Sequence, residues 1–165
     1  MLDKMQTVFQ HHYIIALGSN RPHGRHGAPR GVIAAALKTL PVVAASRIIL
    51  SRPIGPSRRS YANAVALIES ELNPPALLAW LKTIEFAFGR RRGQRWGARV
   101  LDLDIIFWSG GILTSKNLSI PHPRFDERGF VVGPLATITP QWRDPLTRLS
   151  VKQLKARLDR ARACP

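Results

Sequence analysis

Short apolar runs separated by glycine and proline make up most of the chain, and their spacing predicts alternating strands and helices. Runs rich in branched residues favour strands, whereas apolar residues three and four positions apart favour helices. Pro74 and Pro75 suit a helix start, and Gly89 suits the position just after a helix end. The predicted strands are 12–17, 42–50, 61–70 and 100–108, and the predicted helices are 32–40, 76–88, part of 124–139 with a break at 133–134, and 151–163.

The order of the first six elements predicts an α+β fold, a ferredoxin-like βαββαβ sandwich. Right-handed crossovers would give an antiparallel sheet with helices packed on one side. A hairpin after Gly110 and Gly111 and one or two C-terminal helices are added to this core. Because no repeat or linker interrupts the chain, we expect one domain over 1–165, with 1–11 and 151–165 at its periphery and Leu154 and Leu158 docking the last helix.

The last predicted strand of this core carries the strongest chemical signal. Asp102 and Asp104 are two positions apart, so a strand places both carboxylates on one face and its apolar residues on the other. Neighbouring carboxylates repel unless a cation lies between them, and Mg²⁺ prefers carboxylate and phosphate oxygens. Metal and arginines together suit phosphoryl transfer, which depends on positioning and charge neutralisation. The stretch just before the strand supplies Arg90, Arg91, Arg92, Arg95 and Arg99.

Spacing alone leaves other interpretations open. An Asp-x-Asp strand can be a solvated face paired with arginines, and an arginine-rich loop can bind nucleic acid. Strict alternation also places Arg99 on the face opposite Asp102, so the strand must begin after Arg99 or contain a bulge.

Composition narrows the kind of partner. A formal net charge of +15 over 165 residues calls for an anionic partner, either a polyphosphate ligand or nucleic acid. The only cysteine, Cys164, excludes a disulfide within the chain and a cysteine metal site. No apolar run is long enough for a signal peptide or a membrane span. We therefore expect a cytoplasmic protein without a membrane partner, and a monomer.

Two shorter features are less specific. Gly18, Ser19 and Asn20 predict a turn in which main-chain groups approach a neighbour closely, although an ordinary strand-to-helix turn has the same composition. His23 and His26 have a spacing that a metal could use, but their glycine-rich loop contains no acidic partner. We expect both histidine side chains to be solvated.

Five motifs follow one another along the chain: GSN at 18–20, RPIGP at 52–56, YANA at 61–64, RWGARVLDLDII at 95–106 and IPHPRFDERGFVVGPL at 120–135. In this order they resemble the 6-hydroxymethyl-7,8-dihydropterin pyrophosphokinases of folate biosynthesis. The likeness extends from Tyr13 to about Asp144. It implies Mg²⁺-dependent transfer of pyrophosphate from ATP to the pterin hydroxymethyl group, with attack at the β-phosphorus and release of AMP.

The resemblance also implies roles for individual residues. Asp102 and Asp104 would hold two Mg²⁺ ions and, with Arg90 and Arg99, form the catalytic group. Tyr61 would stack on one side of the pterin. The other pterin contacts would be Ser51, Pro53, Ile54, Gly55, Asn63 and Trp96, with Phe130 as the second stacking ring. The ATP contacts would be Glu85, Arg92, Arg95, Ile105, Ser119, His122 and Arg128.

Departures from the family pattern concern the nucleotide. Lys82, Asn117 and Pro123 replace residues found in some members, so their contacts with ATP stay open. The main rival function is a basic nucleic-acid-binding ferredoxin-like domain. The paired aspartates would repel a phosphate backbone unless metal-bound, and the aromatic strand pattern of RNA-recognition sheets is missing. A member that binds but no longer catalyses is disfavoured by the retained aspartates and arginines.

Overall fold

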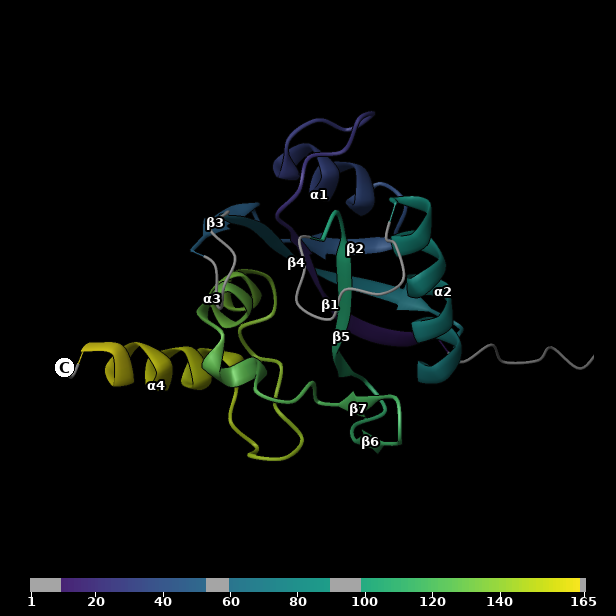
Figure 1. The fold of residues 1–165 in the computed structure, drawn as a ribbon. Coiled ribbons are helices and arrows are strands. Elements are labelled where there is room, and N and C mark those ends of the chain that lie inside the picture. Colours follow the sequence, from purple (N-terminus) through teal and green to yellow (C-terminus); the bar gives the residue numbers. More distant parts are fainter. Residues whose placement is uncertain (1–9, 53–59, 90–98, 164–165) are drawn as a thin grey trace, which may run out of the picture.

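An antiparallel sheet with helices on both faces forms the centre of the computed structural model, which describes residues 10–52, 60–89 and 99–163 (Figure 1). The strands are β1 (His11–Ser19), β2 (Val42–Ala45), β3 (Ile49–Ser51), β4 (Tyr61–Ser70), β5 (Asp102–Trp108), β6 (Leu113–Thr114) and β7 (Ser119–Ile120). The helices are α1 (Pro29–Leu37), α2 (Pro74–Ala87), α3 (Gly129–Ile138) and α4 (Val151–Ala163), with a 3-10 helix η1 (Phe125–Glu127) before α3.

Strand β1 lies between β4 and β5 and pairs antiparallel with both, giving the order β2-β4-β1-β5. Both β2 and β3 pair with β4, at opposite ends of it, so the predicted strand 42–50 is divided in two. The division occurs because the hydroxyl of Ser46 accepts the main-chain N–H of Val65 (3.0 Å) where a regular ladder would use a main-chain oxygen. The predicted mixed fold on an antiparallel sheet is confirmed.

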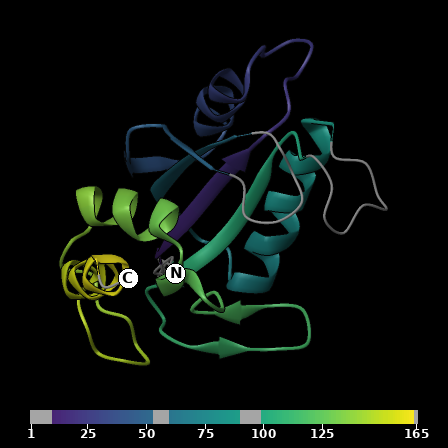
Figure 2. The ribbon, with the colours of Figure 1, turned by 60° about the vertical axis from the view of Figure 1, so that its left-hand side comes forward.

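Side chains alternate across the sheet and create two apolar cores. Tyr13, Ile15 and Leu17 of β1 pack with α1 and α2, whereas Ile14 and Val65 pack with α3 and α4. Figure 2 shows α3 and α4 together, across the sheet from α2. The two helices of the predicted βαββαβ core, α1 and α2, therefore lie on one side of the sheet as expected, and the added helices α3 and α4 cover the other side. Because the central strands carry apolar residues on both faces, both faces need cover.

The predicted helix ends are only partly correct: α1 begins and ends three residues earlier than the predicted helix 32–40. Helix α2 ends as expected, since Gly89 takes a left-handed conformation (φ 84°) just beyond it. Helix α3, in contrast, continues through Pro134, where the sequence predicts a break. The residues around Pro134 are buried in the second core, and this packing outweighs the one hydrogen bond that proline cannot donate.

The segment after β1 differs from the prediction in two respects. The predicted turn begins later than expected, because Gly18 and Ser19 belong to β1. His23 and His26 are stacked, with ring centroids 4.8 Å apart, and His26 lies 5.0 Å from the ring of Phe88. The histidines are half-buried rather than fully solvated, because the phenyl ring at the end of α2 gives them an apolar surface. Burial, then the charges of His23 and Arg25, lower the pKa of His26.

Helix α4 is fixed to the domain at its start. The main-chain N–H groups of Val151 and Lys152 donate to the carbonyls of Trp142 (2.9 Å) and Pro140 (3.0 Å). Val151 and Leu154 are buried in the second core, and Leu158 packs against its edge as expected. Among the described residues, no helix has the length and apolar character needed to cross a membrane.

Replacing Leu154 by alanine should destabilise the protein by about 2–5 kcal/mol, because it leaves a cavity between α4 and α3. Leu146→Ala is the matched control, since Leu146 is 63% exposed and its loss should change stability by less than about 0.5 kcal/mol. Urea unfolding of both variants measures the difference. Equal, small effects would mean that α4 is not packed on α3 in solution.

Candidate active site

The side chains of Asp102 and Asp104 lie on the same face of β5, as predicted, with Leu103 on the opposite face in the first core. The ladder places Asp102 beside Gly18 of β1, and Gly18 beside Asn63 of β4. These three residues form a row across adjacent strands. Because Gly18 has no side chain, the space above the middle strand is left open: a Cβ there would lie 3.5 Å from Oδ1 of Asn63.

Arg99 joins this face from outside the strand. Its Nη1 donates to Oδ2 of Asp102 at 2.6 Å. Because β5 begins at Asp102, strict alternation does not apply to Arg99, and the expectation that the strand starts after it is confirmed. Burial would lower the pKa of Arg99, but the charges of Asp102, Asp104 and Glu85 together raise it. The guanidinium is therefore protonated.

Asp104 lies in a mixed electrostatic environment. Burial raises its pKa, and the neighbouring charge of Asp102 raises it further. His122, Lys82 and Arg128 act in the opposite direction but do not cancel these effects. Two residues predicted to contact ATP, His122 and Arg128, are thus gathered around this carboxylate. Lys82 belongs with them, although the sequence marks it only as a departure from the family pattern.

The paired carboxylates fit a Mg²⁺ site. Asp104 is largely buried and lies near the carboxylate of Asp102, and both effects raise its pKa; a divalent cation bound by the two carboxylates would offset both. In the part of the chain that the structure describes, no group of three or more His, Cys, Asp or Glu could hold a metal. Two carboxylates would leave the remaining positions to water and phosphate oxygens, which is the coordination that Mg²⁺ prefers.

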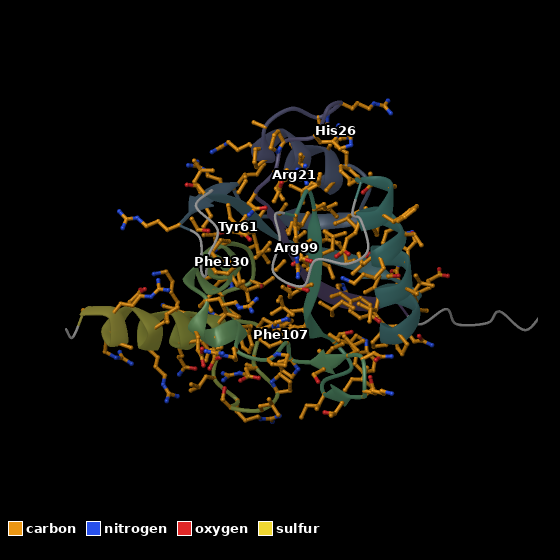
Figure 3. All side chains as sticks on the ribbon, viewed as in Figure 1. Arg21, His26, Tyr61, Arg99, Phe107 and Phe130 are labelled. Atoms are coloured by element: carbon orange, nitrogen blue, oxygen red, sulfur yellow. The ribbon has the colours of Figure 1, made fainter. Side chains whose placement is uncertain are left out.

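Predicted pterin-contacting residues lie on the same face of the sheet. Asn63 is buried, and its Nδ2 donates to the hydroxyl of Ser51 at 2.7 Å. Ser51 pairs with Tyr61 where β3 meets the start of β4. Phe130 is the second residue of α3 and packs at the edge of the second core. In the view of Figure 3, Tyr61 and Phe130 lie beside β3 and α3, and Arg99 lies toward β5.

Two predicted ATP contacts lie on the other side of β5. Glu85 is fully buried in α2, where its Oε1 accepts from the main-chain N–H of Leu103 and from Nζ of Lys82, both at 2.8 Å. It therefore supports the outer edge of the strand between the two aspartates. The side chain of Ile105 is buried in the first core, facing away from Asp104.

The remaining predicted residues are less closely gathered or not described. Ser119 pairs with Thr114 in the small β6–β7 ladder. The main-chain N–H of His122 donates to the carbonyl of Ile106 at 3.0 Å, and its buried Nδ1 has no hydrogen-bond partner within the described residues. Asn117 and Pro123 are exposed. Pro53, Ile54, Gly55, Arg90, Arg92, Arg95 and Trp96 lie outside the described residues.

Asn20 is a residue whose part in the site the sequence does not reveal. It is 1% exposed and contacts the main chain of Arg99 through two hydrogen bonds. The GSN motif was its only signal, because the partner lies 79 residues further along the chain.

Comparison with known proteins decides the family. The model of the family described as 7,8-dihydro-6-hydroxymethylpterin-pyrophosphokinase matches residues 14–140, a range that contains both aspartates and α3. The chain belongs to this family. The pyrophosphokinase of Haemophilus influenzae is 42% identical over 131 residues, covering 75% of this chain and 79% of its own length. That of Pseudomonas aeruginosa is 40% identical over 138 residues, covering 79% and 82%.

Other pyrophosphokinase-family relatives are longer than the matched segment. The Synechocystis pyrophosphokinase is 43% identical over 109 residues, and the chain spans 56% of its length. A crystal structure of Plasmodium falciparum HPPK-DHPS with pteroate superposes with a TM-score of 0.73 and 11% identity. It covers 94% of this chain, which spans 44% of the Plasmodium protein. This likeness supports the fold, and the predicted pyrophosphokinase family is confirmed.

Replacing Asp104 by asparagine should stabilise the metal-free protein at neutral pH. A carboxyl whose pKa is raised on folding contributes most below its unfolded pKa, and that contribution is lost as pH rises through the folded pKa. The neutral amide removes this penalty, so the melting temperature in EDTA should rise by a few degrees at pH 7.

The exposed Asp126 provides a matched control, and Asp126→Asn should leave the melting temperature nearly unchanged. Adding Mg²⁺ should stabilise the wild type more than Asp104→Asn. A lower melting temperature for Asp104→Asn in EDTA would contradict the electrostatic account.

Proposed function

We propose that this chain transfers pyrophosphate from ATP to the hydroxymethyl group of 6-hydroxymethyl-7,8-dihydropterin and releases AMP, a step of folate biosynthesis. Membership of the pyrophosphokinase family supports the reaction. The observation that carries it is that one face of the sheet holds both Asp102 and Asp104, with Asp102 bonded to Arg99 and in a row with Gly18 and Asn63. Phosphate-binding and pterin-binding groups thus share one surface.

The reaction breaks one bond and forms one. The pterin hydroxyl oxygen attacks the β-phosphorus, the bond from that phosphorus to the bridging α,β-oxygen breaks, AMP leaves with this oxygen, and the hydroxyl proton is lost. Asp102 and Asp104 would hold Mg²⁺, and two ions are expected from the family. When bound, the metal neutralises phosphate charge and lowers the hydroxyl pKa. Arg99 is protonated and close enough to Asp102 to share phosphate oxygens with the metal site.

The pterin would lie over Gly18. Since Nδ2 of Asn63 is engaged by Ser51, its Oδ1 faces the open space above Gly18 and can accept a hydrogen bond from a ring N–H. Tyr61 and Phe130 come from different elements beside this space and would stack on the flat bicycle. Ser51 would act through Asn63.

For ATP, the charges around Asp104 support His122 and Arg128 as phosphate contacts, with Lys82 added to them. Glu85 would act by holding β5 through Leu103 rather than by touching the nucleotide. A contact from Ile105 would have to come from its main chain, since its side chain is in the core. The roles of Ser119, Arg90, Arg92, Arg95 and Trp96, and of 53–55, stay predictions.

The sheet also bears on the architecture of the core. The strand order β2-β4-β1-β5 with antiparallel neighbours supports a ferredoxin-like core. A single domain over 1–165, a monomeric state and a cytoplasmic location stay predictions from the sequence.

The test is nucleotide release from ATP and Mg²⁺ with and without 6-hydroxymethyl-7,8-dihydropterin. The proposal expects AMP that depends on the pterin. Pterin-dependent ADP would mean that a single phosphate is transferred, and no nucleotide consumption would leave a binding function only.

Phe130→Ala should weaken pterin binding by at least about fivefold, because stacking adds about 1 kcal/mol to the buried area. Phe86→Ala is the matched control, as Phe86 is 72% exposed on α2. Titration calorimetry with the pterin and an unreactive ATP analogue measures both affinities. An unchanged affinity for Phe130→Ala would remove this ring from the site.

A further inference from the structure

The main chain of Arg99 is held from both sides by one residue. The N–H of Arg99 donates to Oδ1 of Asn20 at 2.7 Å, and the N–H of Asn20 donates to the carbonyl of Arg99 at 3.1 Å. Asn20 is 1% exposed, so this contact is shielded from water. A buried pair of hydrogen bonds of this kind fixes both the position and the direction of a peptide unit.

The contact begins where the regular sheet ends. Gly18 and Asp102 are the last paired residues between β1 and β5. Beyond them, Asn20 uses its side-chain oxygen where a longer strand would use a main-chain carbonyl. The connection between the two strands thus continues to Arg99, although neither Asn20 nor Arg99 belongs to a strand.

This placement has a consequence for the arginine side chain. With its main chain held by Asn20, Arg99 directs Nη1 to Oδ2 of Asp102 at 2.6 Å. Within the described chain, the hydrogen bonds to the main chain of Arg99 come from Asn20.

We infer that Asn20 is a positioning residue for pyrophosphoryl transfer: it holds the main chain of Arg99 so that the guanidinium meets the Asp102 carboxylate and the transferred phosphates. This inference rests on the proposed function. Asn20 touches neither substrate and acts through its contact with Arg99. A catalytic arginine displaced by about 1 Å can cost a large part of the rate, so loss of the contact should appear in kcat.

The main test compares Asn20→Ala with Asn20→Asp in the AMP-release assay. Asn20→Ala removes the acceptor and should lower kcat by about tenfold or more, with the KM for pterin within about twofold of the wild type. Asn20→Asp keeps an oxygen at the same reach and should recover most of the lost kcat. Equal losses in both variants, or a loss confined to KM, would overturn the inference.

Asn73 provides a matched control. Its side chain also accepts a main-chain N–H, that of Ala76 at 3.0 Å, but at the exposed start of α2. Asn73→Ala should lower the melting temperature as a helix-cap loss does, with kcat unchanged. If Asn73→Ala and Asn20→Ala lowered kcat equally, the effect of Asn20 would be one of general stability, against the inference.

A double-mutant cycle separates action through Arg99 from any independent role. In an Arg99→Ala background, Asn20→Ala should lower kcat by less than about twofold further. Multiplying losses would contradict action through Arg99.

Amide hydrogen exchange at Arg99 measures the contact without any activity. The wild type and Asn73→Ala should protect this amide, and Asn20→Ala should expose it; unchanged protection in Asn20→Ala would overturn the inference. Wild-type protein that releases no pterin-dependent AMP would instead refute the proposed function.

Discussion

The two carboxylates on one face of β5 need positive charge nearby, and the surrounding structure supplies it. Asp102 and Asp104 repel each other, and burial adds to the cost of ionising Asp104. Arg99 pairs with one carboxylate, while the charges of Lys82, His122 and Arg128 act on the other. Lys82, His122 and Arg128 come from α2, from the segment after β7 and from the start of α3. Elements far apart in sequence therefore converge on one strand.

The rest of the fold fixes β5 at both edges and on its buried face. On its outer edge, the buried carboxylate of Glu85 accepts the N–H of Leu103, between the two aspartates. On its inner edge, β1 pairs with it as far as Gly18, and Asn20 extends the connection to Arg99. Beneath it, Leu103 anchors the strand in the core under α1 and α2. The face with the two aspartates can carry like charges because the opposite face and both edges are fixed.

Local patterns predicted what depends on local physics. The period of two residues placed Asp102 and Asp104 on one face, and proline and glycine marked the ends of α2. Tertiary contacts decided the rest. Burial kept α3 helical through Pro134, and the hydroxyl of Ser46 divided one expected strand into two.

The site shows the same division between local and distant causes. Asn20 acts on a residue 79 positions away, which no spacing rule could indicate. Lys82 comes close enough to act on Asp104 only because α2 packs beside β5. The substrate roles came from resemblance to the family, since residue types and spacing alone left a solvated strand and a nucleic-acid surface as alternatives.

We propose that metal, phosphates and pterin meet on the face of the sheet that carries Asp102, Asp104 and Asn63. A crystal structure with Mg²⁺, an unreactive ATP analogue and the pterin would show whether they do. We expect Mg²⁺ on both aspartates, and the pterin over Gly18 between Tyr61 and Phe130. Ligands on the face covered by α1 and α2, or a cation held without the aspartates, would contradict it.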